Sequence, residues 1–143
     1  MKSSVIPVLG LLVFALCLAS CSPSSGASVQ ASCDDFMKLQ TPAVISKQVQ
    51  VPAGSSFTVT LCSNQTTGFQ WSESAQISNQ TVIRQTGHKF EPPKSGLVGA
   101  AGQEVWTFEA LKKGTGSISM EYSRPWEGGE KGTWKFNLTV IVK

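Results

Sequence analysis

The stretch Trp134-Lys-Phe-Asn-Leu-Thr-Val-Ile-Val142 decides the fold class. Every second residue in it is apolar, and Lys, Asn and Thr stand between the first four, which is the period of a β-strand with one buried face. The same alternation recurs at Ser56–Leu61 and Ser117–Tyr122, and Val105–Phe108 forms a two-faced strand. Shorter candidates are Ile45–Val51, Phe69–Ser72 and Thr81–Arg84.

Turn residues separate these stretches. Clusters of Pro, Gly, Asn and Ser occur at 52–54, 63–68, 91–96 and 128–129, and such residues favour tight turns. No ten-residue stretch of the body carries a helical apolar stripe, and Asp34–Leu39 is expected to form at most one helical turn. We therefore predict an all-β fold, an antiparallel β-sandwich of about seven to eight strands, with a closed barrel as the alternative.

The composition limits the classes of function. The chain has 143 residues, enough for one domain, and 41% of them are hydrophobic, which excludes a disordered tail protein. Its net charge of +3 comes from 12 basic and 9 acidic residues that are scattered along the sequence. Nucleic-acid binders normally carry a basic cluster, so we expect no nucleic-acid partner.

The first twenty residues have the composition of a signal peptide. Lys2 precedes the apolar stretch Val5–Leu18, which is too short to be interpreted first as a membrane span. The sequence Leu18-Ala-Ser-Cys21 that follows resembles a bacterial lipobox. We expect removal of residues 1–20 and lipid modification of Cys21, with ordinary secretion as the alternative. The protein would then be exported and anchored by lipid to a bacterial membrane, on its periplasmic or cell-surface side.

Residues 21–32 are interpreted as the lipidated N-terminus and a flexible tether, because Ser, Gly and Ala dominate them. The folded domain is predicted at 33–143. It retains Cys33 and Cys62, an even pair for which a disulfide is expected in an oxidising compartment. Two buried free thiols are the alternative.

The sequence offers little material for catalysis. His88 is the only histidine and is predicted to be solvated in a loop. The few carboxylates show no spacing that argues for a glycosidase pair. The segment Gly99–Gly102 is rich in glycine but lacks the Lys-Ser/Thr of a phosphate-binding loop. We predict no enzymatic activity, no metal and no cofactor.

Three loop sequences are distinctive. They are Asn64-Gln-Thr-Thr-Gly-Phe69, Gly96-Leu-Val-Gly-Ala-Ala-Gly102 and Arg124-Pro-Trp126. Each is weak by itself, but their order and spacing together resemble the chagasin-type family of cysteine-peptidase inhibitors. The resemblance runs from about Val44 to Val142, and Gln65 departs from it where the family has proline.

The resemblance implies an immunoglobulin-like β-sandwich whose three loops gather at one end and occlude the cleft of a papain-like cysteine peptidase. Inhibition would be reversible and non-covalent, and the domain is expected to act as a monomer. The implied peptidase-contacting residues are Asn64, Thr66, Thr67, Gly68, Phe69, Gly99, Ala100, Ala101, Gly102, Arg124, Pro125 and Trp126.

Individual side chains have alternative interpretations. Trp126 is expected to be an exposed aromatic anchor. The other aromatic residues of this set are expected in the core or on a sheet face rather than as ligand platforms: Phe69, Trp71, Trp106, Phe108 and Trp134. For Arg124 two roles remain open, contact with the enzyme or bracing of the loop by hydrogen bonds, and bracing is favoured. The competing function is a β-sandwich lipoprotein that holds a carbohydrate or an envelope partner through Trp126.

Overall fold

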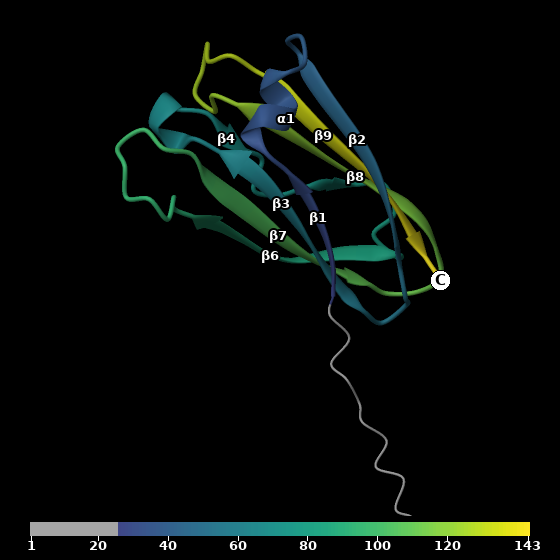
Figure 1. The fold of residues 1–143 in the computed structure, drawn as a ribbon. Coiled ribbons are helices and arrows are strands. Elements are labelled where there is room, and N and C mark those ends of the chain that lie inside the picture. The colour runs from purple at the N-terminus through teal and green to yellow at the C-terminus, as the bar shows by residue number, and fades with distance from the viewer. Residues whose placement is uncertain (1–25) are drawn as a thin grey trace, which may run out of the picture.

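The computed structural model describes residues 26–143, which fold into two β-sheets packed face to face (Figure 1). In chain order the elements are β1 (Ala27–Ala31), α1 (Cys33–Met37), β2 (Ala43–Val51), β3 (Ser56–Ser63), the 3-10 helix η1 (Gln65–Thr67), β4 (Gln70–Trp71), β5 (Gln76–Ile77), β6 (Ile83–Glu91), β7 (Gly102–Ala110), β8 (Gly114–Ser123) and β9 (Trp134–Val142). One sheet has the order β1-β3-β7-β6, and the other has the order β2-β9-β8-β4 with β5 paired to β8. None of the described residues belongs to a helix long and apolar enough to cross a membrane.

The prediction of an all-β sandwich is confirmed, but both sheets are mixed rather than antiparallel, and the described residues form nine strands. β1 runs parallel to β3, and β2 runs parallel to β9. Alternation of apolar residues reports which face of a strand is buried and carries no information on the direction of its neighbours.

Part of the segment predicted as a tether is folded. Residues 27–31 form the edge strand β1, whose Val29 and Ala31 are buried against the core. Small residues with polar neighbours concealed this strand, which obtains its backbone partners from β3. The folded domain therefore includes residues before the predicted boundary at Cys33. The predicted signal peptide, Cys21 and the rest of the tether lie outside the described residues.

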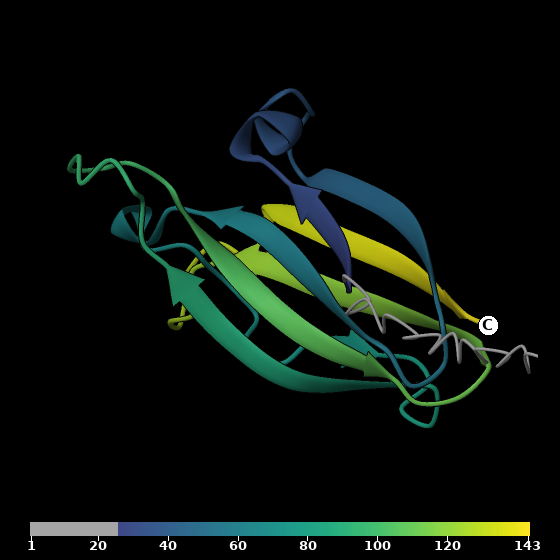
Figure 2. The ribbon, with the colours of Figure 1, turned by 60° about the horizontal axis from the view of Figure 1, so that its bottom comes forward.

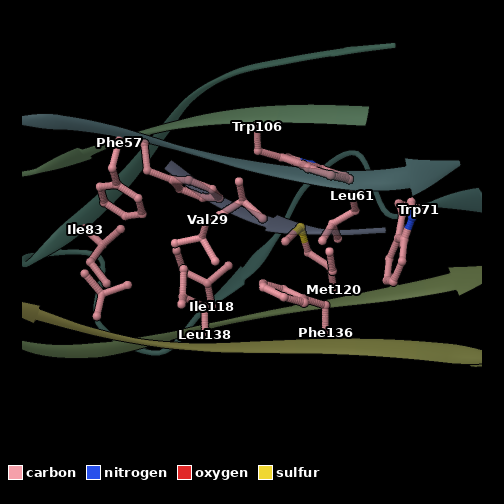
Figure 3. Packing of buried hydrophobic residues seen from close by; sticks show 14 of the residues in the cluster. Val29, Phe57, Leu61, Trp71, Ile83, Trp106, Ile118, Met120, Phe136 and Leu138 are labelled. Carbon is pink, nitrogen blue, oxygen red and sulfur yellow. The ribbon is translucent and has the colours of Figure 1, made fainter. Parts of the chain in front are cut away.

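The core lies between the two sheets. Figure 3 shows Phe57, Leu61 and Trp106 from one sheet facing Ile118, Met120, Phe136 and Leu138 from the other. Of the aromatic residues predicted in the core or on a sheet face, Trp71, Trp106 and Phe108 are each at most 1% exposed, and Phe69 and Trp134 are half-buried and pack against the core. Burial of these large side chains provides most of the driving force for folding.

The short helix α1 closes one end of the sandwich, where a single helical turn was predicted. Ser32 and Asp35 form a reciprocal capping box at its start. Its buried Phe36 stacks on Trp134, with ring centroids 4.8 Å apart. The predicted disulfide between Cys33 and Cys62 is present and joins α1 to β3.

Candidate functional site

Three connections leave the same end of the sandwich, which we call the loop end (Figures 1 and 2). The first loop is 64–69, between β3 and β4; the second is 92–101, between β6 and β7; the third is 124–133, between β8 and β9. The strand register explains this gathering, because Ser63 pairs with Gly102 and Tyr122 pairs with Trp134. We call the opposite end, with the turns at 52–55 and 111–113, the far end.

The first loop is held in shape by its own polar side chains. Asn64 Oδ1 accepts hydrogen bonds from the Thr66 amide (3.3 Å) and from Thr66 Oγ1 (2.6 Å), which caps η1. Thr67 Oγ1 donates to the Asn64 carbonyl at 2.7 Å. The loop therefore presents a fixed turn rather than an extended peptide.

Gly68 ends η1, and two features of its position favour glycine. Its φ of +80° lies in the left-handed region, which L side chains rarely adopt. In addition, a Cβ atom at this position would lie 2.5 Å from Cη2 of Trp126. The indole ring thus rests directly on the glycine backbone.

Arg124 ties the third loop to the first. Its guanidinium carbon lies 4.5 Å from the centroid of the Phe69 ring, and Nη2 donates to the Thr67 carbonyl at 3.4 Å. Lys131 Nζ donates to the Trp126 carbonyl at 3.0 Å, which closes the turn that carries Trp126. The structure therefore gives Arg124 the bracing role.

The second loop is fastened to the first by one hydrogen bond, from Asn64 Nδ2 to the Gly99 carbonyl at 3.0 Å. Its tip exposes Leu97 (70%) and Val98 (fully). Neither residue is among the peptidase-contacting residues that the family resemblance implies. The sequence did contain a signal for them, because two large apolar residues stand between glycines in a predicted loop.

The predicted contact residues are brought together, with one correction. Gly102 is buried in β7 rather than exposed, and a Cβ there would collide with the Glu91 carbonyl oxygen, so close pairing with β6 explains the glycine. The exposed ones are Thr66, Thr67, Gly99, Ala101, Pro125 and Trp126, and the half-buried ones are Asn64, Gly68, Phe69, Ala100 and Arg124.

Comparison with known proteins identifies the family to which this chain belongs. The sequence model described as chagasin family peptidase inhibitor I42 matches residues 50–140. The chain is 35% identical over 99 residues to chagasin from Trypanosoma cruzi, an alignment that covers 65% of this chain and 84% of that protein. The chain belongs to the chagasin family. Because the family consists of peptidase inhibitors, the prediction that this protein is not an enzyme is confirmed.

Solved structures share the fold of this chagasin-family domain. The crystal structure of the cysteine protease inhibitor EhICP2 from Entamoeba histolytica matches with a TM-score of 0.61 at 20% identity, covering 83% of this chain and 98% of that chain. PbICP-C, solved in complex with falcipain-2, matches with a TM-score of 0.59 at 16% identity, covering 82% of this chain and 100% of that chain. The predicted immunoglobulin-like sandwich is thereby confirmed.

A buried carboxylate supports the base of the first loop in this chagasin-family member, and sequence reasoning missed it. Glu104 is 1% exposed. Its Oε1 accepts hydrogen bonds from Ser63 Oγ (2.6 Å) at the start of the loop and from the Trp71 amide (3.2 Å) just after its end. A buried carboxylate with several hydrogen bonds fixes the relative positions of its donors.

The second carboxylate oxygen of Glu104 faces His88, whose Nε2 lies 2.9 Å away. His88 stands in β6 and packs against Trp106, so the prediction of a solvated loop histidine is wrong. The Gly and Pro residues near His88 suggested a loop, whereas β6 continues through a register shift between Gln85 and Gly87.

Proposed function

We propose that this protein is a reversible, non-covalent inhibitor of papain-like cysteine peptidases that blocks the active-site cleft with its three loops. One observation carries the proposal: the loops that bear the family motifs form a single cross-braced surface. Asn64 bonds to Gly99, Arg124 bonds to Thr67, and Trp126 rests on Gly68. Such preorganisation reduces the entropy lost on binding.

The comparisons add support for the target class. EhICP2 is described as a cysteine protease inhibitor, and PbICP-C was solved in complex with falcipain-2. The braced first loop also suits inhibition without cleavage. In our proposal the helical turn at 65–67 and the left-handed Gly68 keep the main chain out of the extended conformation of a substrate, while the small threonines fill the cleft.

The proposed anchor residue is Trp126, which is 52% exposed at the loop end. Aromatic side chains of this kind dominate interface energies. Its ring is held by contact with Gly68 and its turn by Lys131, so little freedom remains to be lost on docking.

The test is a titration of papain and several cathepsin-type peptidases with the purified full-length protein in detergent. Gly68→Glu should weaken inhibition by about two orders of magnitude or more, because it displaces Trp126 and introduces a charge that must be desolvated. Trp126→Ala should cost about 2 kcal/mol, roughly thirtyfold. Bound inhibitor should also protect the peptidase's active-site thiol from alkylation without consuming it.

A matched control separates the effect of backbone strain at a left-handed glycine from the effect of a substitution in the proposed peptidase-binding surface. Gly54 in the far-end turn has the same φ of +80°, but a Cβ there would meet no atom within 4 Å. Gly54→Glu should therefore lose stability as Gly68→Glu does, yet inhibit like the wild type. A wild-type protein that inhibits no papain-like peptidase contradicts the proposal and favours a carbohydrate or envelope ligand.

We also propose export and lipid anchoring through Cys21, on the basis of the signal-like stretch and the Leu-Ala-Ser-Cys sequence. Ala27, at the start of β1, pairs with Phe57 at the far end of the sandwich. An anchor at Cys21 would therefore attach to the far end and leave the loops directed away from the membrane. Cys21→Ser should release the protein from membranes, and retention after a salt wash would contradict the anchor.

A further inference from the structure

Exposed apolar side chains are distributed unequally over the two ends of the sandwich. Among the described residues the large exposed ones are Met37 (64%), Leu39 (43%), Val44 (46%), Leu97 (70%), Val98 (104%), Leu111 (39%) and Trp126 (52%). Only Leu111 stands at the far end. Leu97, Val98 and Trp126 belong to the second and third loops, whereas the other three lie outside all three loops, in the segment 33–44.

This segment shares a surface with the loops. A hollow of about 520 Å³ is lined by Met37 of α1 together with Thr67 and Phe69 of the first loop, Ala101 of the second, Arg124 of the third, and Trp134. The exposed Met37 side chain is thus continuous with the surface that we propose to enter the cleft. Contiguous exposed apolar surface of this kind marks sites of interaction.

The segment is also held firmly. Its Cys33 is bonded to Cys62, two residues before the first loop, and Phe36 is fully buried between Trp71 and Trp134. Met37 therefore projects from a fixed helical turn rather than from a mobile tail. The segment precedes residues 50–140, the part that matches the family.

We propose that segment 33–44 is a fourth contact element, in which Met37, Leu39 and the adjoining hollow receive apolar side chains from the wall of the peptidase cleft. The inference rests on the proposed function. If the three loops enter the cleft, its two walls lie along the sides of the inhibitor. Surface that is set back from the loop tips then contacts those walls. In Figure 2, α1 (dark blue) lies at one side of the sandwich and is set back from the tip of the second loop at the far left.

The test compares two variants of the full-length protein against papain. Met37→Ser combined with Leu39→Ser should raise the inhibition constant about tenfold, the effect of a modest apolar contact, at an unchanged melting temperature. The matched control is Leu111→Ser, which removes a similarly exposed leucine from the far end and should leave inhibition as in the wild type. Equal inhibition constants for all three proteins, or equal losses in both variants, would overturn the fourth contact.

Hydroxyl-radical footprinting gives a second measurement that needs no variant. Oxidation of Met37 should fall several-fold when papain is bound, whereas Leu111 should react equally in the free and bound inhibitor. Buried Met120 provides the unreactive internal reference. A Met37 that stays reactive in an inhibited complex overturns the inference, as does protection that appears without peptidase at raised concentration, because the occupant would then be a second copy. Failure of the wild type to inhibit would instead contradict the proposed function.

Discussion

The two ends of the sandwich are built differently. At the far end, main-chain hydrogen bonds fasten the turns to neighbouring segments: the Gly54 amide donates to the Ala110 carbonyl at 2.7 Å, and the Leu111 amide donates to the Val82 carbonyl at 2.8 Å. At the loop end, the connections are made by side chains. Asn64 and Arg124 connect separate loops, and Glu104 accepts hydrogen bonds at the base of the first loop. Main-chain bonds suffice to hold these short turns against the sheets, whereas side-chain hydrogen bonds fix the relative positions of three longer loops.

The glycines illustrate this difference. Gly54 and Gly68 have the same φ of +80°, so each turn needs a residue that tolerates the left-handed region. Only Gly68 has a neighbouring side chain against its backbone, that of Trp126. A turn glycine and a contact glycine thus look identical in sequence and in φ, and differ only in what rests on them.

Among the changes considered, removal of the disulfide should have the largest effect on stability, and that effect should be concentrated at the loop end. In the chain-entropy model, a bridge across 29 residues contributes about 3–4 kcal/mol. Cys33→Ser combined with Cys62→Ser should lower the free energy of unfolding by that amount in urea titrations. Amide exchange should accelerate most in α1 and the first loop, and least in the turn at 52–55.

Equal acceleration at both ends would contradict a local role for the disulfide. The bond itself can be checked by mass spectrometry of a non-reduced digest of the wild type. The peptides that contain Cys33 and Cys62 should be recovered linked, and free thiols on both would disprove the bond.

Two glutamates on β7 give the next comparison. Glu104 is buried at the loop end, whereas Glu109 forms an exposed ion pair with Arg84 at the far end. Glu104→Ala should cost about 2–3 kcal/mol, because Ser63 and Trp71 lose their buried acceptor. Glu109→Ala should cost under about 1 kcal/mol.

Inhibition measurements show whether Glu104 positions the first loop or only stabilises the fold. Glu104→Ala should weaken inhibition at temperatures where the variant remains folded, because both stems of the first loop depend on this carboxylate. Glu104→Gln keeps one acceptor oxygen and should recover part of the loss. If Glu104→Ala inhibits like the wild type, the network stabilises the fold without positioning the loop.

The sequence predicted features that depend on local periodicity and missed those that depend on pairing. Alternation located β9 and the aromatic core, and the motifs located the loop end. The parallel partners of β1 and β2 were not predictable, because alternation is the same for either direction. Glu104 and His88 are ordinary polar residues in sequence, and only the register of β6 and β7 brings them within 2.9 Å. Gly102 was misplaced because a strand glycine resembles a loop glycine.

The smallest predicted effect concerns pH and again separates the two ends. At the cap of α1, Asp35 Oδ2 accepts hydrogen bonds from the Ser32 amide and from Ser32 Oγ, both at 2.8 Å. These bonds, the backbone one first, hold the pKa of Asp35 below its ordinary value of 3.8. The unfolded chain therefore binds the proton more readily, so the cap stabilises fully above the ordinary value and loses its effect as the pH falls through the lower pKa of the folded state.

Acid should consequently loosen α1 before it affects the far-end turns, whose main-chain bonds do not titrate. Asp35→Asn should remove this pH dependence, since an amide carries no charge to lose, while its oxygen still accepts from Ser32. Urea midpoints of wild type and variant should differ by a constant amount near neutral pH and converge as the pH falls below 3.8. A carboxyl resonance of Asp35 that titrates at or above its ordinary value, or midpoints that stay parallel into acid, would show that the capping carboxylate contributes nothing that depends on its charge.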